Sequence, residues 1–512
     1  MPRADDIIDA PPPMLLALHE PGATALLLAV FGLLMAFSAL FSRLLDRMGV
    51  PVVLLFLVLG MLGGSEGIGG LHFENYEAAF RIGTIALILI LFDGGLNTSF
   101  LSVKRSAAPA AVLATLGVLG TAAALAVIAR LAGLTWTEAI LIGAIVSSTD
   151  AAAVFAVLRG GSLRVKEHVR SLLEVESCAN DPMAIILTFA AVAAVDGGLR
   201  GAGGWWLLAD VPLQLGIGLA VGLGLAYATR FVLKHSRFTA TGLYPVITLA
   251  SAFVIFGTAT MMNGSGFLAV YVAGLVLGNG PLPHRNGLAR VHDALAWLSQ
   301  VSMFLMLGLL VTPSDLPGIF WIGTIVALGL AIVARPAVVA ACLVPFGFKP
   351  REIGYVSWVG IRGAVPIILA TVPVMAGIPG AERIFHVVFF IVVISAIVPG
   401  ATIVPLTRKL KLDDPEPTPP AAALELHSLR PLDGVIHVYR IDATLAVCGV
   451  PLAKITFPEG SAAIMISRGN EVMAARGHTV LEVGDHVYIF CKPGDEPRIR
   501  LLFGADVDSG EI

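Results

Sequence analysis

The chain has 512 residues, of which 57% are hydrophobic and 13% are charged, against about 25% charged in an average soluble protein. A mean hydropathy of +0.87 argues against a soluble globular protein. The net charge of −3 argues against a strongly basic nucleic-acid binder. Four cysteines lie far apart without Cys-x-x-Cys spacing, which disfavours a disulfide framework or a structural zinc site. The composition therefore predicts a polytopic membrane protein.

Thirteen apolar stretches follow one another along the chain, and a membrane-crossing helix needs roughly 20 such residues. They cover residues 22–43, 50–65, 80–97, 107–131, 137–158, 171–195, 205–233, 243–261, 266–280, 294–311, 318–346, 353–377 and 384–407. We expect residues 22–407 to form one membrane domain of these helices.

Loops rich in lysine and arginine alternate with loops poor in them along this domain. One set of loops carries eighteen of these residues and the opposite set carries five. Positive charges collect on the cytoplasmic side of a membrane. The pattern therefore places residues 1–21 outside and everything after Thr407 in the cytoplasm.

The charge balance changes sign near residue 413. Residues 1–412 contain 25 Lys/Arg and 21 Asp/Glu, whereas residues 413–512 contain 8 and 15. The Pro-rich, acidic run LDDPEPTPPAAALEL lies in a predicted cytoplasmic linker, 408–426, which we expect to be extended. Four β-like runs follow, GVIHVYRI, AAIMISRG, NEVMAARG and HVYIFC, and they predict a small α+β domain over 427–505 and a short tail at 506–512. A domain of this size is marginal alone, which favours dimerisation.

Ionisable side chains in the interior of the predicted spans are the main functional signal, because each costs at least about 2.5–3.5 kcal/mol to insert. There are five of them: Asp150, Glu176, Asp181, Arg335 and Arg362. Their formal charges sum to −1, which one monovalent cation balances. Any of them alone is compatible with a structural ion pair. The sum leaves one acid unpaired, and we assign that role to Asp181.

Two of these charges lie where their helices are weakest. Asp150 ends a Ser-Ser-Thr-Asp run at 147–150 whose side chains compete for backbone hydrogen bonds. Arg362 lies in VGIRGAVP at 359–366, where two glycines and a proline weaken a helix. The two spans are the fifth and the twelfth, so they cross in opposite directions, as the broken helices of an inverted-repeat transporter do. Two ordinary kinked helices are the alternative.

The segment LLEVESCANDPMAIILT at 172–188 groups oxygen-bearing side chains on a helix. Ser177 and Asp181 share one face, and Glu176 and Asn180 share the neighbouring face. Carboxylate and hydroxyl oxygens suit Na⁺ or K⁺ better than a transition metal. We therefore predict a monovalent cation site at Asp181. Asp93 supports it, either by orienting a cytoplasmic funnel or by capping backbone.

Together these segments resemble the monovalent cation:proton antiporters of the NhaP type, and more narrowly the potassium/proton branch with a cytoplasmic regulatory tail. The matching segments are LFDGGL at 91–96, SSTDAAAVFAVLR at 147–159, VESCANDPMAIILT at 175–188 and GIRGAVPIILA at 360–370. The tail is similar, over 451–490, to the C-terminal half of RCK regulators of potassium transport, the TrkA-C domain.

The resemblance implies an all-α bundle of about 13 helices with inverted repeats and two broken, crossing helices. It implies a homodimer in the lipid of a bacterial inner membrane. It also implies roles for the residues singled out above. Asp181 would bind cation and proton alternately beside Asn180, Thr149 and Asp150 would form the unwound motif, Glu176 would pair with Arg335, and Arg362 would compensate the broken helices.

We therefore expect a secondary antiporter that exchanges K⁺ or Na⁺ for H⁺, with K⁺ favoured by the tail, in a 1:1 electroneutral cycle. It needs no cofactor, although the tail is expected to take an unknown small ligand. An RCK-gated channel would need a carbonyl filter such as TVGYG, and the sequence offers none. A membrane enzyme is disfavoured because His386, at a helix edge, is the only histidine within a predicted span. The alternative role for the tail is to strengthen the dimer.

Overall fold

The computed structural model describes residues 52–414 apart from 72, 161–162, 196–204, 237, 239, 281 and 283, residues 434–504 apart from 470 and 493, and nine residues between 22 and 40. Most of the first predicted span, most of the linker and the 506–512 tail lie outside the described residues. The chain divides into two compact units, Met1–Asp414 and Pro415–Ile512, and each is described by itself.

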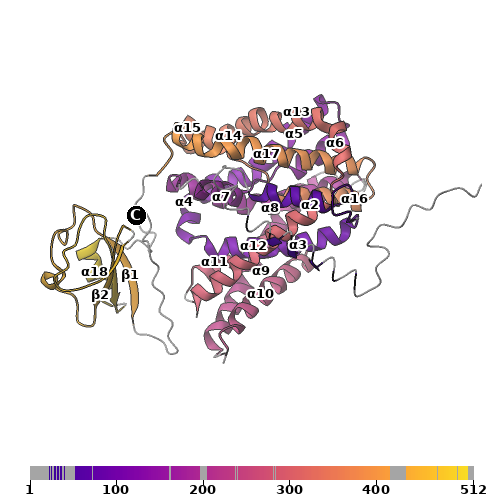
Figure 1. The fold of residues 1–512 in the computed structure, drawn as a ribbon. Coiled ribbons are helices and arrows are strands. Elements are labelled where there is room, and N and C mark those ends of the chain that lie inside the picture. Colours follow the sequence, from indigo (N-terminus) through magenta and orange to yellow (C-terminus); the bar gives the residue numbers. More distant parts are fainter. Residues whose placement is uncertain are drawn as a thin grey trace, which may run out of the picture. The chain divides into compact units, whose positions relative to one another are not determined.

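The first unit is a bundle of helices (Figure 1). Its helices are α2 (Val52–Gly63), α3 (Tyr76–Asn97), α4 (Phe100–Val112), α5 (Val118–Leu131), α6 (Trp136–Ile145), α7 (Ala151–Gly160), α8 (Glu167–Val195), α9 (Trp205–His235), α10 (Leu243–Met261), α11 (Gly266–Gly278), α12 (Arg285–Leu309), α13 (Leu316–Gly329), α14 (Arg335–Leu343), α15 (Pro350–Trp358), α16 (Ala364–Met375) and α17 (Ala381–Lys409). Short π-helical turns, Leu113–Gly117 and Leu330–Ala334, join α4 to α5 and α13 to α14.

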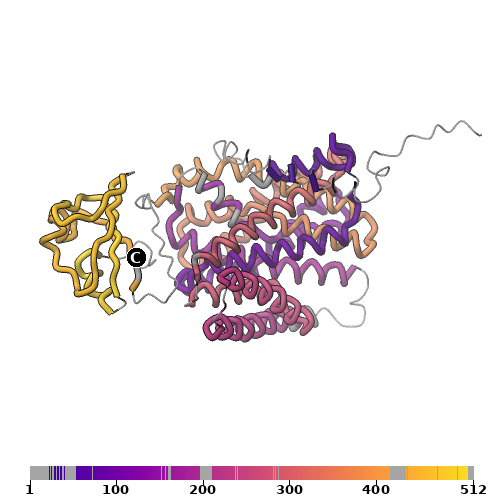
Figure 2. Tube along the Cα trace, turned by 60° about the horizontal axis from the view of Figure 1, so that its bottom comes forward, coloured from indigo at the N-terminus to yellow at the C-terminus, as the bar shows by residue number. Residues whose placement is uncertain are grey.

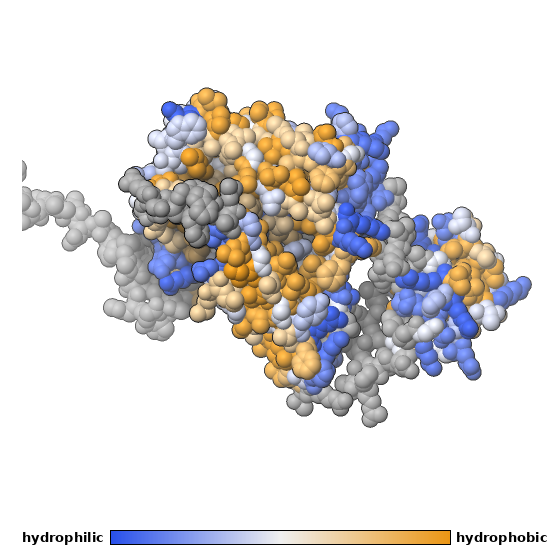
Figure 3. Space-filling view, turned by 180° about the vertical axis from the view of Figure 1, so that it is seen from behind, coloured by the Kyte–Doolittle hydropathy of each residue, from blue (hydrophilic) through white to orange (hydrophobic). Residues whose placement is uncertain are grey.

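Within the described residues, seven helices are long and apolar enough to cross a membrane, and four shorter helices are also apolar. Large side chains face outward from them; Leu131 is 82% exposed and Trp321 is 74% exposed. Figure 3 shows the hydrophobic side chains that cover much of one face of this unit. Water does not favour such a surface, whereas lipid does, so the first unit is a multi-pass membrane domain.

Two helices are interrupted where the sequence predicts a break. The fifth predicted span divides into α6 and α7, with residues 146–150 between them, and the twelfth divides into α15 and α16 around 359–363. A capping box at Thr135 and Glu138 fixes the start of α6. The polar run before Ala151 and the glycines around Arg362 interrupt the helical hydrogen-bond ladder at the two breaks, as their residue types favour.

The helices of the bundle form two groups, and each group has a core that lies mainly within it. One core joins α4, α7, α8, α14, α15 and α17 and also includes Leu54 of α2, and another joins α3 and α9 to α12. We call α4–α8 with α13–α17 the broken-helix group, and α2, α3 and α9–α12 the flanking group. Helices α9 and α10 pack side by side at the edge of the flanking group (Figure 2). A third core contains residues of both groups, so the broken-helix group and the flanking group contact each other through apolar side chains.

The second unit holds an antiparallel sheet of four strands, in the order β1-β4-β2-β3. The strands are β1 (Val435–Arg440), β2 (Ala462–Arg468), β3 (Glu471–Ala474) and β4 (His486–Cys491), and helix α18 (Glu496–Phe503) follows. The core of the unit forms from buried residues of the sheet and of α18, among them Tyr439, Ile489 and Phe503. Arg468 on β2 binds the fully buried Asp485 through two nitrogens, each 2.8 Å from a carboxylate oxygen.

Candidate functional site

The two helix breaks cross each other in direct contact. The backbone N–H of Asp150 donates to the carbonyl of Ile361 at 2.8 Å, and Nη1 of Arg362 donates to the carbonyl of Ser148, also at 2.8 Å. A Cβ atom on Gly363 would lie 2.2 Å from Oδ2 of Asp150, so any larger residue there would displace the Asp150 side chain. The side chain of Asp150 also caps the first turn of α7 by accepting from Ala153 N. Each break therefore satisfies backbone groups of the other.

Helix α8 braces the first break through two side chains that the sequence assigns to the cation site. Ser177 donates to the carbonyl of Thr149 at 3.0 Å and accepts from Ala151 N at 3.1 Å. The Nδ2 group of Asn180 donates to Thr149 Oγ1 at 2.6 Å. Ser177 and Asn180 do not line the cavity beside Asp181. In this conformation they hold the unwound segment in place.

Asp181 lies at a cavity of about 60 Å³ between the two helix groups. The broken-helix group contributes three polar neighbours, Ser148, Thr149 and Asp150. This volume has room for several water molecules, or for an ion with part of its hydration shell. Two carboxylates and two hydroxyls are hard oxygen ligands, which fits the predicted monovalent cation. Among the described residues, no lysine or arginine forms a salt bridge with Asp181.

The flanking group supplies the opposite wall of this cavity. Helix α3 contributes Leu87, Ile90 and Leu91, and α12 contributes Gln300, Met303 and Phe304. Asp93, the predicted supporting residue, is outside this lining, and the side chain of Asn97 donates to its Oδ1 at 3.1 Å. The cavity therefore has a charged wall on one helix group and a mostly apolar wall on the other.

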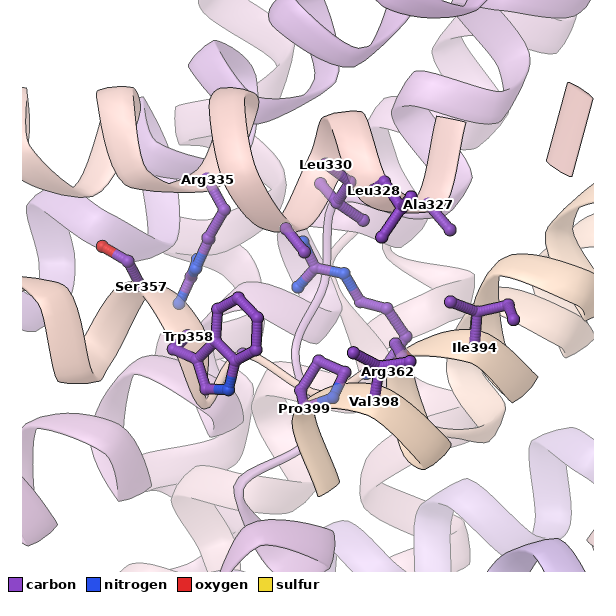
Figure 4. A pocket seen from close by; sticks show the side chains of 13 residues that line it. Ala327, Leu328, Leu330, Arg335, Ser357, Trp358, Arg362, Ile394, Val398 and Pro399 are labelled. Carbon is purple, nitrogen blue, oxygen red and sulfur yellow. Dashed lines mark hydrogen bonds between the residues drawn. The ribbon is translucent and has the colours of Figure 1, made fainter. Parts of the chain in front are cut away.

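The remaining buried charges meet at a separate place. Nη2 of Arg335 donates to Oε1 of Glu176 at 2.7 Å, and both side chains are almost fully buried. Arg335 and Arg362 also line a small cavity of about 20 Å³, which can hold one water molecule (Figure 4). In the described part of the protein, Nε of both arginines and Nη2 of Arg362 have no hydrogen-bond partner. Arg335 thus pairs with Glu176, and Arg362 supports the helix crossing.

The prediction left only His386 within a membrane span, but three helices extend beyond the predicted spans and contain the further histidines His168, His235 and His292. Helix α12 begins at Arg285, before the predicted span at 294, and it contains the buried His292. The Nε2 atom of His292 lies 2.8 Å from Thr248 Oγ1, and its ring packs 4.9 Å from that of Phe92. Charged residues early in α12 hide this start from a hydropathy scan. Periodic apolar residues such as Leu288 are the signal that was available.

Comparison with known proteins places this site in a family. Residues 32–409 match the family model "Sodium/hydrogen exchanger, transmembrane", and residues 436–504 match the TrkA-C domain. The K(+)/H(+) antiporter NhaP2 of Shewanella sp. (strain MR-4) is 39% identical over 92% of this chain and 81% of its own length. The K(+)/H(+) antiporter NhaP of Alkalimonas amylolytica is also 39% identical, over 95% of this chain and 85% of its own length.

The fold is similar to that of a solved antiporter. The sodium proton antiporter MjNhaP1 from Methanocaldococcus jannaschii aligns with a TM-score of 0.64 at 25% sequence identity, over 75% of this chain and 99% of its own. The region that the exchanger family model matches, residues 32–409, includes the helices of both groups that line the cavity. The chain belongs to the sodium/hydrogen exchanger family and carries a TrkA-C domain.

Proposed function

We propose that this protein is a bacterial K⁺/H⁺ antiporter that exchanges one cation for one proton at Asp181. The observation that supports it most is the position of this carboxylate in the cavity between the two helix groups, with no cationic partner among the described residues. The names of the relatives at 39% identity favour K⁺ as the cation. The family consists of secondary transporters, so the cation and proton gradients drive the exchange.

Competition at one carboxylate explains the coupling. A carboxylate inside a membrane domain is costly to keep charged without a partner, so Asp181 takes up either a proton or a cation. Both loaded forms have the same net charge, and moving the site between the two sides of the membrane then carries no charge. Asn180 beside it does not titrate, which limits the site to one exchangeable charge. This gives a 1:1 electroneutral cycle with alternating access.

Na⁺ is the alternative cation, because both ions bind the same oxygen ligands. The sodium proton antiporter MjNhaP1 shares this fold at 25% identity. The experiment is proton flux in everted vesicles with K⁺, Na⁺ or Li⁺ added in turn between about pH 6 and 9, a range within which we expect a carboxylate inside the membrane to change its protonation state. We expect K⁺ to give the largest flux. A response to Na⁺ alone would favour the alternative, and flux that persists in Asp181→Asn would contradict the proposed site.

For the architecture, we propose thirteen membrane crossings arranged as inverted repeats, with the N-terminus outside and the C-terminus in the cytoplasm. Two pairs of features, each seven spans apart, support the repeats. The helix breaks lie in the fifth and twelfth spans, and the π-turns Leu113–Gly117 and Leu330–Ala334 lie in the fourth and eleventh. We further propose a homodimer in the bacterial inner membrane, as the family resemblance implies.

We propose that the tail domain regulates transport by binding a small ligand. The linker to this domain begins at a pair of backbone hydrogen bonds that can transmit ligand binding to the membrane domain. The N–H of Lys166 donates to the carbonyl of Leu412 at 3.0 Å, and the N–H of Asp414 donates to that of Arg164 at 2.9 Å. We call this pairing of 164–166 with 412–414 the linker clip. It joins the end of the membrane domain to the loop between α7 and α8; Asp150 directly precedes α7, and Asp181 lies on α8.

Two proline variants of the full chain test this role of the linker clip. Asp414→Pro removes a donor of the clip, whereas Asp413→Pro leaves both hydrogen bonds in place and removes the same charge. We expect Asp414→Pro to have the exchange rate and pH profile of a chain that ends at Asp414, and Asp413→Pro to match the unaltered protein. Identical behaviour of both variants and the unaltered chain would favour a tail that only strengthens the dimer.

A further inference from the structure

Gln300 occupies an unusual place in the cavity beside Asp181. The flanking group lines this cavity with two triplets, Leu87, Ile90 and Leu91 on α3 and Gln300, Met303 and Phe304 on α12. Each triplet has the spacing i, i+3, i+4, so each is one face of its helix. Five of the six side chains are apolar. A polar side chain on such a face, inside a membrane, calls for a function.

We propose that Gln300 is a cation ligand that determines the affinity for the cation on one side of the membrane. This proposal rests on the proposed exchange at Asp181 and adds a specificity-determining residue to that site. The Gln300 amide suits Asp181 in both its proton-loaded and its cation-loaded form. Its carbonyl oxygen can accept a hydrogen bond from the protonated carboxyl or coordinate the cation, and its NH₂ group can donate to the carboxylate. A neutral amide also leaves the balance of one exchangeable charge intact.

The rigidity of α12 gives Gln300 a fixed position within the flanking group. A Cβ atom on Gly308 would lie 2.3 Å from the carbonyl of Leu57, and one on Gly60 would lie 2.2 Å from the carbonyl of Leu305. The backbones of α12 and α2 are therefore in direct contact through these glycines. A helix held this closely does not slide past its neighbour without losing that packing.

Asp181 and Gln300 belong to different helix groups, and this makes the ligand set depend on the conformation. Asp181, Thr149 and Asp150 move together, because hydrogen bonds join α8 to the first break. If the broken-helix group carries the site across the membrane, Gln300 remains with the flanking group. It then contacts the cation in the access state that has the present cavity and loses that contact in the other. The two sides of the membrane therefore have different affinities for the cation.

The test is the cation KM of the full-length protein measured from each side, in right-side-out and everted vesicles. We expect Gln300→Leu to raise KM on one side by about three- to tenfold, the effect of losing one neutral hydrogen bond or ligand, and to leave the maximal rate within about twofold. Gln300→Glu keeps an oxygen ligand and should restore or lower that KM. Ser299→Ala, which removes a buried hydroxyl from the same turn outside the cavity lining, is the control and should leave both values unchanged.

Unchanged KM on both sides in Gln300→Leu would overturn the proposal. An equal rise on both sides would also overturn it, because it would mean that Gln300 travels with Asp181 or acts through the fold. Asp181→Asn, measured in parallel, separates this inference from the proposed function. Exchange that survives in Asp181→Asn contradicts the site itself, whereas loss of exchange there with unaltered KM in Gln300→Leu contradicts only the role of Gln300.

Discussion

The buried ion pair between Glu176 and Arg335 gives a quantitative prediction. Their side chains are 1% and 3% exposed, and the N–O distance is 2.7 Å. Removing one partner of such a pair leaves the other charge buried, which costs about 3–5 kcal/mol, whereas replacing both charges costs far less. We therefore expect Glu176→Gln and Arg335→Met each to destabilise the protein strongly, and the double variant to be more stable than either single variant.

Thermal melting of the detergent-solubilised protein, followed by size-exclusion chromatography with fluorescence detection, measures this effect. The two single variants and the double variant form a double-mutant cycle, which isolates the pairwise energy. Melting losses that add, so that the double variant is as unstable as the sum of the two single variants, would refute the reasoning. Charge also predicts an effect on transport, because Glu176→Gln changes the sum of the five charges within the predicted spans from −1 to 0 and should weaken cation binding.

Two further predictions concern the helix crossing and the tail. Gly363→Ala should abolish or severely reduce exchange, because its Cβ would overlap the Asp150 carboxylate. Gly354→Ala is the control and should remain active, because a Cβ there has no atom within 4 Å. Proton flux at matched expression measures both variants, and full activity of Gly363→Ala would contradict the helix crossing. Burial and the nearby Arg440 lower the pKa of His486 despite Asp485. Its protonation therefore opposes folding, and the stability of β4, complete above about pH 6.5, should fall as the pH drops through that value. Amide hydrogen exchange of β4 in the full-length protein, corrected for intrinsic rates, measures this stability. Equal protection of β4 above and below about pH 6.5 would contradict the prediction.

The sequence predicts the helices well where hydropathy alone defines them. Helix α10 begins and ends at the predicted residues 243 and 261, and both helix breaks occur at the polar and glycine-rich runs that predict them. In the tail, all four β-like runs form strands. The order of those strands was not predicted, because strand pairing depends on contacts between distant residues and leaves no local pattern.

The site was harder to predict than the helices. The five charges within the predicted spans are visible in the sequence because charge is rare there, but the role of each one depends on packing. Ser177 shares a helical face with Asp181, yet its hydroxyl is engaged by the backbone of the neighbouring break. Gln300 is neutral, so a search for charges does not reveal it. The early start of α12 was missed because its first turns are amphipathic, and tertiary packing decides such a boundary.

The central claim is that one carboxylate, Asp181, holds either a proton or a cation. Proton release on K⁺ addition to the purified full-length protein, read with a pH indicator in weakly buffered solution near neutral pH, measures this competition without any transport step. We predict about one proton released per cation bound in the unaltered protein, since a single acid exchanges its proton for the ion. Asp181→Asn should release none while eluting as a folded protein. Undiminished release from Asp181→Asn would contradict the claim.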